Sequence, residues 1–357
     1  MADTESTQDG SAEAELGRTL GQRFASSFTL AILLSIVVVF TVLKGTTFLS
    51  LANFNNVLLD TSQILMLAIA ATFVIITAGI DLSVSSILIL SAVIAAQSMI
   101  RFSGTPEQTA AYEFPNQHIG IPVGIVLGLV TGAVCGLGNG LLITRLKLPP
   151  FIVTLGTLSV YLGIAQLLTG GTTVPGVPPA IQNDIGLRNL WPPGFLGIDF
   201  RLVPQIVIAF VIALISSVVL SRTRFGRYTY AIGSNAAAAR RVGINVDGHL
   251  LKVYTLSGLL SGIAGIFDLF RFGTASIGTH QLDNLASISA AVIGGTSLFG
   301  GIGAISGSVI GAFIPVVLRN GLVITGVPSF WQNVAIGIVL IVAVWLDQRR
   351  RSAEERM

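Results

Sequence analysis

Charged residues are scarce in this chain, and their scarcity excludes an ordinary soluble protein. Only 10% of the 357 residues are Asp, Glu, Lys or Arg, against about 25% in typical soluble domains. A soluble fold covers its surface with polar side chains, whereas 52% of the residues here are hydrophobic. Most of the surface must therefore face an apolar surrounding such as lipid. The basic residues form no stripe on a polar domain, which excludes a nucleic-acid partner.

Cysteine, lysine and histidine are also rare, and each shortage narrows the possible chemistry. The single Cys135 permits neither an intrachain disulfide nor a cysteine-ligated zinc, and its apolar, glycine-rich surroundings indicate a packing role. None of the three lysines follows a glycine, so the chain lacks the Gly-Lys pair of a nucleotide-binding P-loop. The three histidines fall in expected loops without metal-ligand spacing. We therefore expect no metal, no bound cofactor and no catalytic site.

Long apolar runs dominate the rest of the sequence. Because a helix needs about 20 apolar residues to cross a bilayer, we expect an all-α, polytopic membrane protein with about ten transmembrane helices. These are expected near residues 26–43, 57–78, 82–100, 119–143, 150–168, 203–220, 252–270, 285–297, 302–324 and 331–346. The eighth is expected to be short or re-entrant, because Gly294 and Gly295 end it early.

The basic residues indicate how these helices are oriented. With the N-terminus inside and ten crossings, 14 lysines and arginines lie inside and 5 outside, which is the asymmetry of the positive-inside rule. Both termini are therefore expected in the cytoplasm. The expected organisation is a polar, acidic tail over 1–25, a transmembrane domain over 26–347 and a basic tail over 348–357. Two long outer loops, 101–118 and 169–202, suit either a docking surface for an external partner or plain connections.

Glycines recur at a spacing of four in two of the expected helices. One set is Gly124, Gly128, Gly132, Gly136 and Gly140, and the other is Gly303, Gly307 and Gly311. Lipid supplies no hydrophobic force between helices, so close backbone approach must supply the packing energy. Both sets predict helix-packing faces. A surface on which helices slide past one another is the alternative.

Polar residues inside the expected helices are costly and often functional. Those that require an explanation are Asp60, Asp81, Asn139, Asp268 and Asn320. Asp81 is expected either to cap the helix that follows it or to contact a solute. Asp268 and Arg271 lie three residues apart and are expected to pair on one helix face. Phe270 and the neighbouring phenylalanines suit either a sugar-stacking face or an interfacial aromatic belt.

Four stretches together resemble the ribose-type sugar permeases of ATP-binding-cassette (ABC) importers. They are residues 77–83 (TAGIDLS), 149–157 (PPFIVTLGT), 226–244 (GRYTYAIGSNAAAARRVGI) and 290–301 (AAVIGGTSLFGG). The third stretch is similar to the cytoplasmic coupling loop of that family and lies in an expected inside loop over about 221–251. The resemblance extends over roughly residues 25–347, so the transmembrane domain would be the permease domain.

The coupling loop is the part that the family places against the ATPase. The residues expected to serve this contact are Gly226, Arg227, Asn235, Ala238, Ala239, Arg240, Arg241 and Gly243. The alanines at 236–239 favour a short helix, which Asn235 can cap and Gly243 can end. A basic loop held near anionic lipid headgroups is the alternative. The family often has glutamate at the place of residue 236 or 237, where this chain has alanine. The resemblance therefore does not support one polar contact between the loop and the ATPase.

The resemblance also implies a mechanism and its partners. The complex would contain two permeases, identical or not, two cytoplasmic ABC ATPase subunits that bind ATP and Mg, and an external solute-binding protein at the bacterial plasma membrane. The cavity between the permeases would switch from outward- to inward-facing when ATP binding moves the coupling loop. Its lining is expected to include Asp81, Asn139, Asp268, Phe270, Thr296 and Ser297.

Three other functions remain open on the sequence. The first is an ABC permease for a branched-chain amino acid, a nucleoside or a signalling molecule, which shares the architecture. The second is an ion-coupled carrier that works alone, for which Asp60 and Asp268 give little support. The third is a membrane enzyme, and the lack of a clustered nucleophile, base or metal set opposes it.

Overall fold

The computed structural model describes residues 29–191 and 201–354 of the chain. The expected acidic tail over 1–25 lies outside these residues. The first seven residues of the expected basic tail over 348–357 continue the helix α12, which runs Ser329–Glu354.

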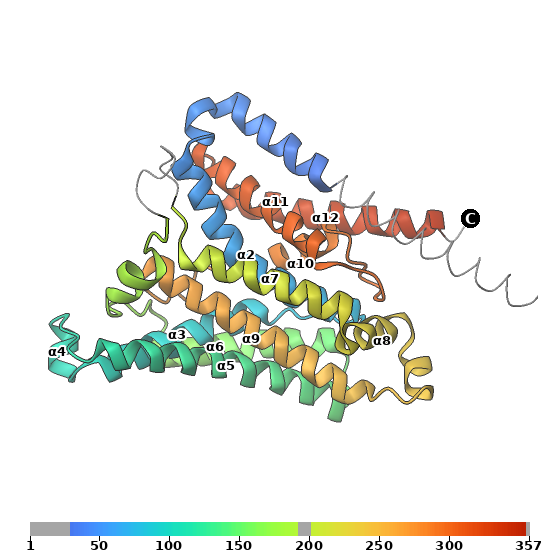
Figure 1. The fold of residues 1–357 in the computed structure, drawn as a ribbon, viewed down its shortest axis with the longest axis horizontal. Helices are drawn as coiled ribbons and strands as arrows, with labels where there is room; N and C mark the ends of the chain where they lie inside the picture. Colours follow the sequence, from blue (N-terminus) through green and yellow to red (C-terminus); the bar gives the residue numbers. More distant parts are fainter. Residues whose placement is uncertain (1–28, 192–200, 355–357) are drawn as a thin grey trace, which may run out of the picture.

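The described residues are almost entirely helical, as the composition predicted (Figure 1). The elements are the helix Thr29–Phe48, α2 Leu51–Ile76, α3 Val84–Ser103, α4 Pro106–Ala110, α5 Gln117–Arg145, α6 Pro150–Thr169, the π-helical turn η1 Ile181–Gly186, α7 Pro204–Arg222, α8 Arg224–Arg241, α9 Val246–Phe272, α10 Asp283–Ile293, α11 Ile305–Ile324 and α12. Within the described ranges there is no strand, and extended backbone pairs only at an isolated bridge between Val174 and Ala275.

Eight helices of the described ranges are long and apolar enough to cross a membrane. They are Thr29–Phe48, α2, α3, α5, α6, α7, α9 and α11, and each lies within six residues of the bounds expected from the sequence. The expected eighth segment is α10, which has only 11 residues and ends before Gly294. The expected last segment, 331–346, lies within α12. The polytopic helical fold is thus confirmed.

Local chemistry sets several helix ends. Ser50 caps α2 by accepting a hydrogen bond from the Asn53 N–H. Pro150 and Pro204 stand in the first turns of α6 and α7, where a missing N–H has no cost. Gly170 ends α6 with a φ of 63°, in the left-handed region that glycine adopts without strain. The proline and glycine signals explain why the bounds of α6 and α7 were predicted closely, whereas α2 begins six residues before its expected start because of the cap at Ser50.

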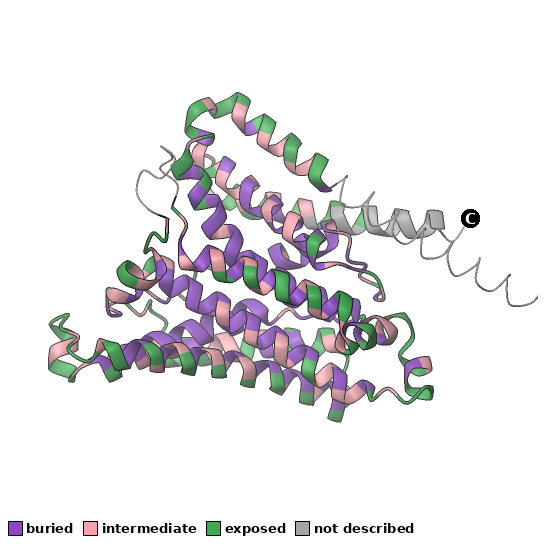
Figure 2. Ribbon diagram, in the orientation of Figure 1, coloured by how far each residue is buried: buried purple, intermediate pink, exposed green. Residues whose placement is uncertain are grey.

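The helices form two groups with α2 between them. Figure 1 shows α3, α5, α6 and α9 side by side along one part of the molecule, and α10, α11 and α12 along the other. α2 contacts α9 of the first group and α10 and α11 of the second. It is buried along most of its length, whereas α5 and α6 expose large parts of their surfaces (Figure 2). Polar side chains on α2 therefore face protein rather than lipid.

Glycines allow α5 to approach α9 until the two backbones touch. A Cβ atom added to Gly132 or Gly136 would collide with the backbone of α9 at Gly258 or Tyr254. The other members of the same face, Gly124, Gly128 and Gly140, lie against α3 or α9. No flexible side chain could move away from such a collision, so this interface requires glycine.

α11 contacts α10 and α2 through glycines as well. A Cβ atom on Gly311 would collide with the Ala290 carbonyl of α10, and one on Gly307 would collide with the Gly294 carbonyl directly after α10. A Cβ atom on Gly303, which lies just before α11, would meet the Ile76 side chain of α2. These contacts bring together two interruptions of the helical chain: residues 77–83 after α2 (the first break) and residues 294–304 after α10 (the second break). The Gly301 N–H donates to the Ile76 carbonyl at 2.9 Å and joins the second break to the end of α2, directly before the first break.

Candidate functional site

A polar cavity of about 530 Å³ lies among α2, α9, α10, α11 and the loop 273–282. Its polar lining consists of Asn56, Asp60, Gln63, Asp268, Arg271, Thr274, Ser276, Thr279, His280, Asp283, Arg319 and Asn320. Such a concentration of charge is exceptional in a chain with 10% charged residues. Ionisable groups among membrane helices are retained chiefly where they line a solute path or cavity.

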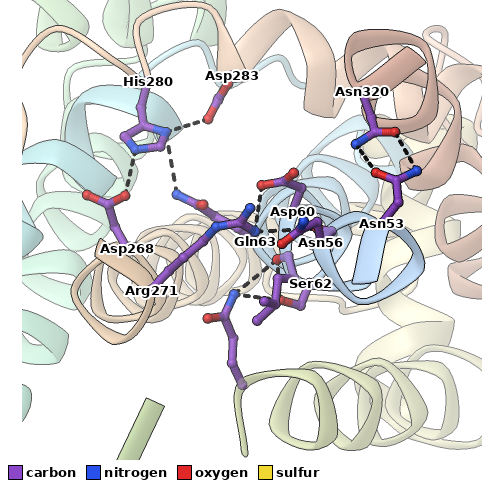
Figure 3. A network of polar contacts seen from close by, with 12 residues as sticks. Asn53, Asn56, Asp60, Ser62, Gln63, Asp268, Arg271, His280, Asp283 and Asn320 are labelled. Atoms are coloured by element: carbon purple, nitrogen blue, oxygen red, sulfur yellow. Dashed lines mark hydrogen bonds and ion pairs between the residues drawn. The ribbon is translucent and has the colours of Figure 1, made fainter. Parts of the chain in front are cut away.

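His280 occupies the wall of this cavity and bridges two carboxylates. Its Nε2 lies 2.9 Å from Oδ1 of Asp268, and its Nδ1 lies 2.8 Å from Oδ2 of Asp283 (Figure 3). Burial alone would lower the pKa of His280, but the hydrogen bonds and charges of Asp268 and Asp283 outweigh it and raise the pKa to about 10. The imidazole is therefore a cation at neutral pH and ties α9, the loop 273–282 and α10 together.

Two further ion pairs complete the charges of the cavity. Arg271 Nη1 lies 2.7 Å from Oδ1 of Asp60, which joins α9 to α2, and Arg319 Nη2 lies 3.4 Å from Oδ1 of Asp283. With His280 protonated, three carboxylates face three cations and the lining is neutral in sum. The side chains of Asp60 and Arg319 remain 41% and 37% exposed, whereas those of His280 and its two carboxylates are at most 9% exposed. Asp60 and Arg319 are thus the charged groups most open to a solute.

The sequence-based pairing of Asp268 with Arg271 is wrong. Asp268 pairs with His280, and Arg271 reaches Asp60, which is 211 residues away in the chain. A pair three residues apart on one helix gains little, whereas a close cation with good hydrogen-bond geometry offsets much of the cost of burying the Asp268 carboxylate. The loop 273–282 brings that cation to Asp268.

The three histidines, which the sequence placed in loops and therefore in contact with solvent, do not all lie there. His280 does lie in a loop but is buried, and His249 lies inside α9, where it contacts Thr229 Oγ1 at 2.9 Å. His118 lies in the first turn of α5 and is exposed. Buried imidazoles persist here because each ring nitrogen that is removed from water finds a polar partner.

Asp81 does not cap the next helix, contrary to the first of its two expected roles. The N-cap of α3 is Ser83, two residues later. The Asp81 carboxylate accepts hydrogen bonds from the Ser83 N–H and Oγ at 3.0 and 2.6 Å and from Ser257 Oγ at 2.8 Å. Asn139 Nδ2 donates to Ser83 Oγ at 2.7 Å. Asp81 and Asn139, both proposed as path residues, therefore share a buried network that fastens the first break to α5 and α9.

The remaining expected path residues lie at separate places. Asp268 is the one member of that set that lines the cavity. Phe270 is buried and packs against Phe267, with ring centroids 6.2 Å apart. Thr296 and Ser297 are buried in the second break. Asp60 and Asn320, two other polar residues that required an explanation, also line the cavity, whereas the roles of His280, Asp283 and Arg319 were not predicted.

One pattern in the sequence could have identified the cavity wall. Asn53, Asn56, Asp60 and Gln63 follow one another at spacings of three and four, which places them on one face of the apolar α2. The structure pairs Asn53 with Asn320 of α11 through two hydrogen bonds of 2.8 and 3.0 Å (Figure 3). Asn56, Asp60 and Gln63 line the cavity.

The expected coupling residues lie on and just after α8. This helix is kinked at Asn235, whose backbone is extended at φ −162° and ψ 98°. Asn235 Oδ1 accepts from the Ala238 N–H at 2.9 Å and caps a second short helix, which ends before Gly243 at φ 86°. We call residues 224–234 the first arm of α8 and residues 235–243 the second arm.

The side chains of the second arm are largely exposed, as a docking surface requires. Arg241 is exposed, and Arg240 forms an exposed ion pair of 2.6 Å with Asp247 at the start of α9. In the first arm Arg227 is exposed, whereas Gly226 is buried against the Leu220 backbone. Ala238 is half-buried and Ala239 buried, so the second arm rests on the body of the protein through its alanines.

Comparisons with known proteins agree with this arrangement. A model of the family described as the permease component of the branched-chain amino acid transport system matches residues 53–344. The ribose import permease protein of Bacillus subtilis is 41% identical, with 89% of this chain and 91% of the relative aligned. The fructose import permease protein of Rhizobium meliloti is 37% identical, over 89% and 84%. The autoinducer 2 import system permease protein of Yersinia pseudotuberculosis is 32% identical, over 91% and 86%. No solved structure matches the chain significantly.

The ribose and fructose import permeases each align with 89% of the chain, and they confirm the resemblance to ribose-type permeases that the four stretches suggested. The eight apolar helices of the described ranges, together with the permease relatives, make the protein a multi-pass protein of the bacterial inner membrane. The chain belongs to the family of membrane-embedded permease components of ABC import systems, under the family model for branched-chain amino acid transport permeases.

Proposed function

We propose that this chain is the membrane-spanning subunit of an ATP-driven importer of a monosaccharide. The observation that carries the proposal is the charge-balanced polar cavity of about 530 Å³ in an otherwise apolar helical protein. Its volume lies in the usual range for small-molecule sites, about 300–1,000 Å³. Relatives over most of the chain's length are named as ribose and fructose import permeases.

The balance of charges supports an uncharged, hydroxyl-rich solute. Every charged group of the lining already has a partner of opposite sign within 3.4 Å. A phosphate or an ammonium group would have to break one of these pairs, and a buried charge that loses its partner is costly. Sugar hydroxyls can instead donate to Asp60 and accept from Arg319 while both ion pairs persist.

The energy for transport comes from a separate ATPase in this proposal. The chain has no P-loop lysine, so ATP and Mg bind to the partner. The exposed second arm of α8 docks on that ATPase, with Arg240 and Arg241 toward its acidic groups. An external binding protein docks on the outer loops, and a second permease copy completes the path. Ten crossings, with α10 and the second break forming one of them, place both termini in the cytoplasm.

Other small solutes fit the same architecture. The permease from Yersinia pseudotuberculosis is named for autoinducer 2 import, and the matching family model is described by branched-chain amino acids. A nucleoside is a further candidate, and an ion-coupled carrier is the alternative outside the ABC class. Uptake measured with a panel of solutes distinguishes autoinducer 2, branched-chain amino acids and nucleosides from a monosaccharide. Uptake measured without the ATPase identifies an ion-coupled carrier.

Uptake by reconstituted vesicles tests the proposal. The vesicles contain this chain, its ATPase and its binding protein, and receive labelled pentoses, hexoses, autoinducer 2, branched-chain amino acids and nucleosides with or without ATP. We expect ATP-dependent uptake of one monosaccharide, and a loss of at least about tenfold in Gly243→Pro or Arg240→Glu. Proline cannot adopt the φ of 86° at position 243. Glutamate reverses the charge at position 240 and leaves the second arm, whose other charged residue is Arg241, without net charge.

Arg145→Glu is the matched control, because Arg145 is an exposed basic residue at the end of α5 outside α8. It is expected to transport like the unaltered protein. Uptake driven by an ion gradient without the ATPase would refute the proposal, and ATP-driven uptake of an amino acid alone would refute the monosaccharide assignment.

A further inference from the structure

The first arm of α8 is in direct contact with the second break and with the end of α2, where the first break begins. Tyr230 Oη donates a hydrogen bond of 2.7 Å to the carbonyl of Gly303 in the second break. A Cβ atom on Gly233 would collide with the Ile76 carbonyl at the end of α2, and it would lie 2.7 Å from the Gly301 nitrogen. The arm therefore lies against backbone, with no flexible side chain between them.

The two breaks are themselves shaped around this contact. Gly300 and Gly301 have φ values of 87° and 75°, in the region that only glycine adopts readily. A Cβ atom on Gly300 would lie 2.8 Å from the Gly233 carbonyl. The Gly301 N–H donates to the Ile76 carbonyl at 2.9 Å, so α8, the second break and α2 meet at one point.

The helices that end at this point are the same helices that line the polar cavity at their other ends. α2 carries Asp60, α10 carries Asp283 and α11 carries Arg319. α2 and α11 are further joined between these points by the hydrogen bond of 2.6 Å between Thr72 and Ser308. Packed helices of this kind move as rigid bodies rather than bending continuously. A displacement of their inner ends must therefore change the cavity.

We propose that Tyr230 and Gly233 form the mechanical link through which α8 moves α2, α10 and α11 and so opens or closes the cavity. The second arm would receive the motion of the ATPase, the kink at Asn235 would pass it to the first arm, and the Tyr230–Gly303 bond would pass it to the second break. Tyr230 is a positioning residue in this scheme, since it touches no solute. The inference rests on the proposed function, because it requires an ATPase at the second arm.

The neighbouring Tyr228 supplies a matched control. It lies on the same arm, is 40% exposed, and packs edge-on against His249 with ring centroids 6.1 Å apart. Tyr230→Phe removes one hydroxyl and its hydrogen bond to Gly303, whereas Tyr228→Phe removes a hydroxyl away from the breaks. Gly233→Ala adds the colliding methyl group, and Gly156→Ala adds a methyl group with no other atom within 4 Å.

The experiment measures solute molecules taken up per ATP hydrolysed in reconstituted vesicles of the whole complex. We expect Tyr230→Phe to assemble normally and to hydrolyse ATP, while the ratio falls about two- to tenfold, as the loss of one hydrogen bond allows. Gly233→Ala is expected to lower the ratio further. Tyr228→Phe and Gly156→Ala are expected to retain the ratio of the unaltered protein. A merely structural role of Tyr230 would lower assembly or thermal stability and leave the ratio unchanged.

A second measurement follows the cavity itself. Thr279→Cys places a thiol in the cavity lining, in a Cys135→Ala background that removes the single native thiol. ATP is expected to change the rate at which a membrane-impermeant maleimide labels this thiol, and Tyr230→Phe is expected to suppress that change. An unaltered ratio and an unaltered labelling change in Tyr230→Phe would overturn the link while leaving the importer intact. Failure of ATP-driven uptake in the unaltered complex would instead overturn the proposed function, and the link with it.

Discussion

Replacement of His280 tests the charge network of the cavity. In His280→Gln the carboxylates of Asp268 and Asp283, whose side chains are 3% and 2% exposed, lose the cation that lies within 2.9 Å of each. Removing one partner of a buried ion pair costs about 3–5 kcal/mol. Asp283 retains Arg319 at 3.4 Å, which offsets part of this cost. We expect a loss of about 3 kcal/mol in the free energy of unfolding at neutral pH.

The same histidine gives the stability of the protein a defined pH dependence. Its pKa is raised from 6.5 to about 10 in the folded protein. The folded state therefore binds the proton more tightly than the unfolded state, and this contribution to stability is complete below about pH 6.5. It decreases as the pH rises and is lost by about pH 10. His280→Gln is expected to lack this alkaline decrease.

Thermal unfolding of the purified protein in detergent from pH 6 to pH 10 measures both effects. His118→Gln is the matched control, because His118 is exposed in the first turn of α5. It is expected to follow the unaltered protein over the whole range. Equal melting temperatures of His280→Gln and the unaltered protein at neutral pH, or an unchanged alkaline decrease, would refute the pairing of His280 with two carboxylates.

Two other substitutions test the helix contacts. Gly136→Ala is expected to lower the free energy of unfolding by about 1–3 kcal/mol, because the added methyl group collides with the α9 backbone. Gly156→Ala, on an open face of α6, is the control and is expected to be neutral or to stabilise the protein by up to about 1 kcal/mol. Thermal unfolding compares the two, and equal melting temperatures would contradict the close α5–α9 contact. Asp81→Asn is expected to cost about 1–3 kcal/mol, because the amide turns a donor toward the Ser257 or Ser83 hydroxyl. If its melting temperature matches that of the unaltered protein, the buried network around Asp81 contributes nothing measurable.

The membrane helices were predictable because each is a local property of the chain. A run of about 20 apolar residues is visible in any window of the sequence, and α6, expected at 150–168, spans Pro150–Thr169. The cap at Asn235 and the left-handed Gly243 were equally local. The spacing that places Asn56, Asp60 and Gln63 on one face of α2 is local as well.

The pairing of charges was not predictable, and the physical reason is the distance along the chain. The sequence shows that Asp268 and Arg271 share a helix face, but it does not show that the loop 273–282 folds back to place His280 at Asp268, or that Asp60 reaches Arg271 from α2. Such contacts depend on how the two helix groups pack around α2. The sequence by itself thus determined a polytopic helical permease with few charges. Only the tertiary structure decided that these charges meet in one neutral cavity and that α8 contacts the end of α2 and the second break, away from that cavity.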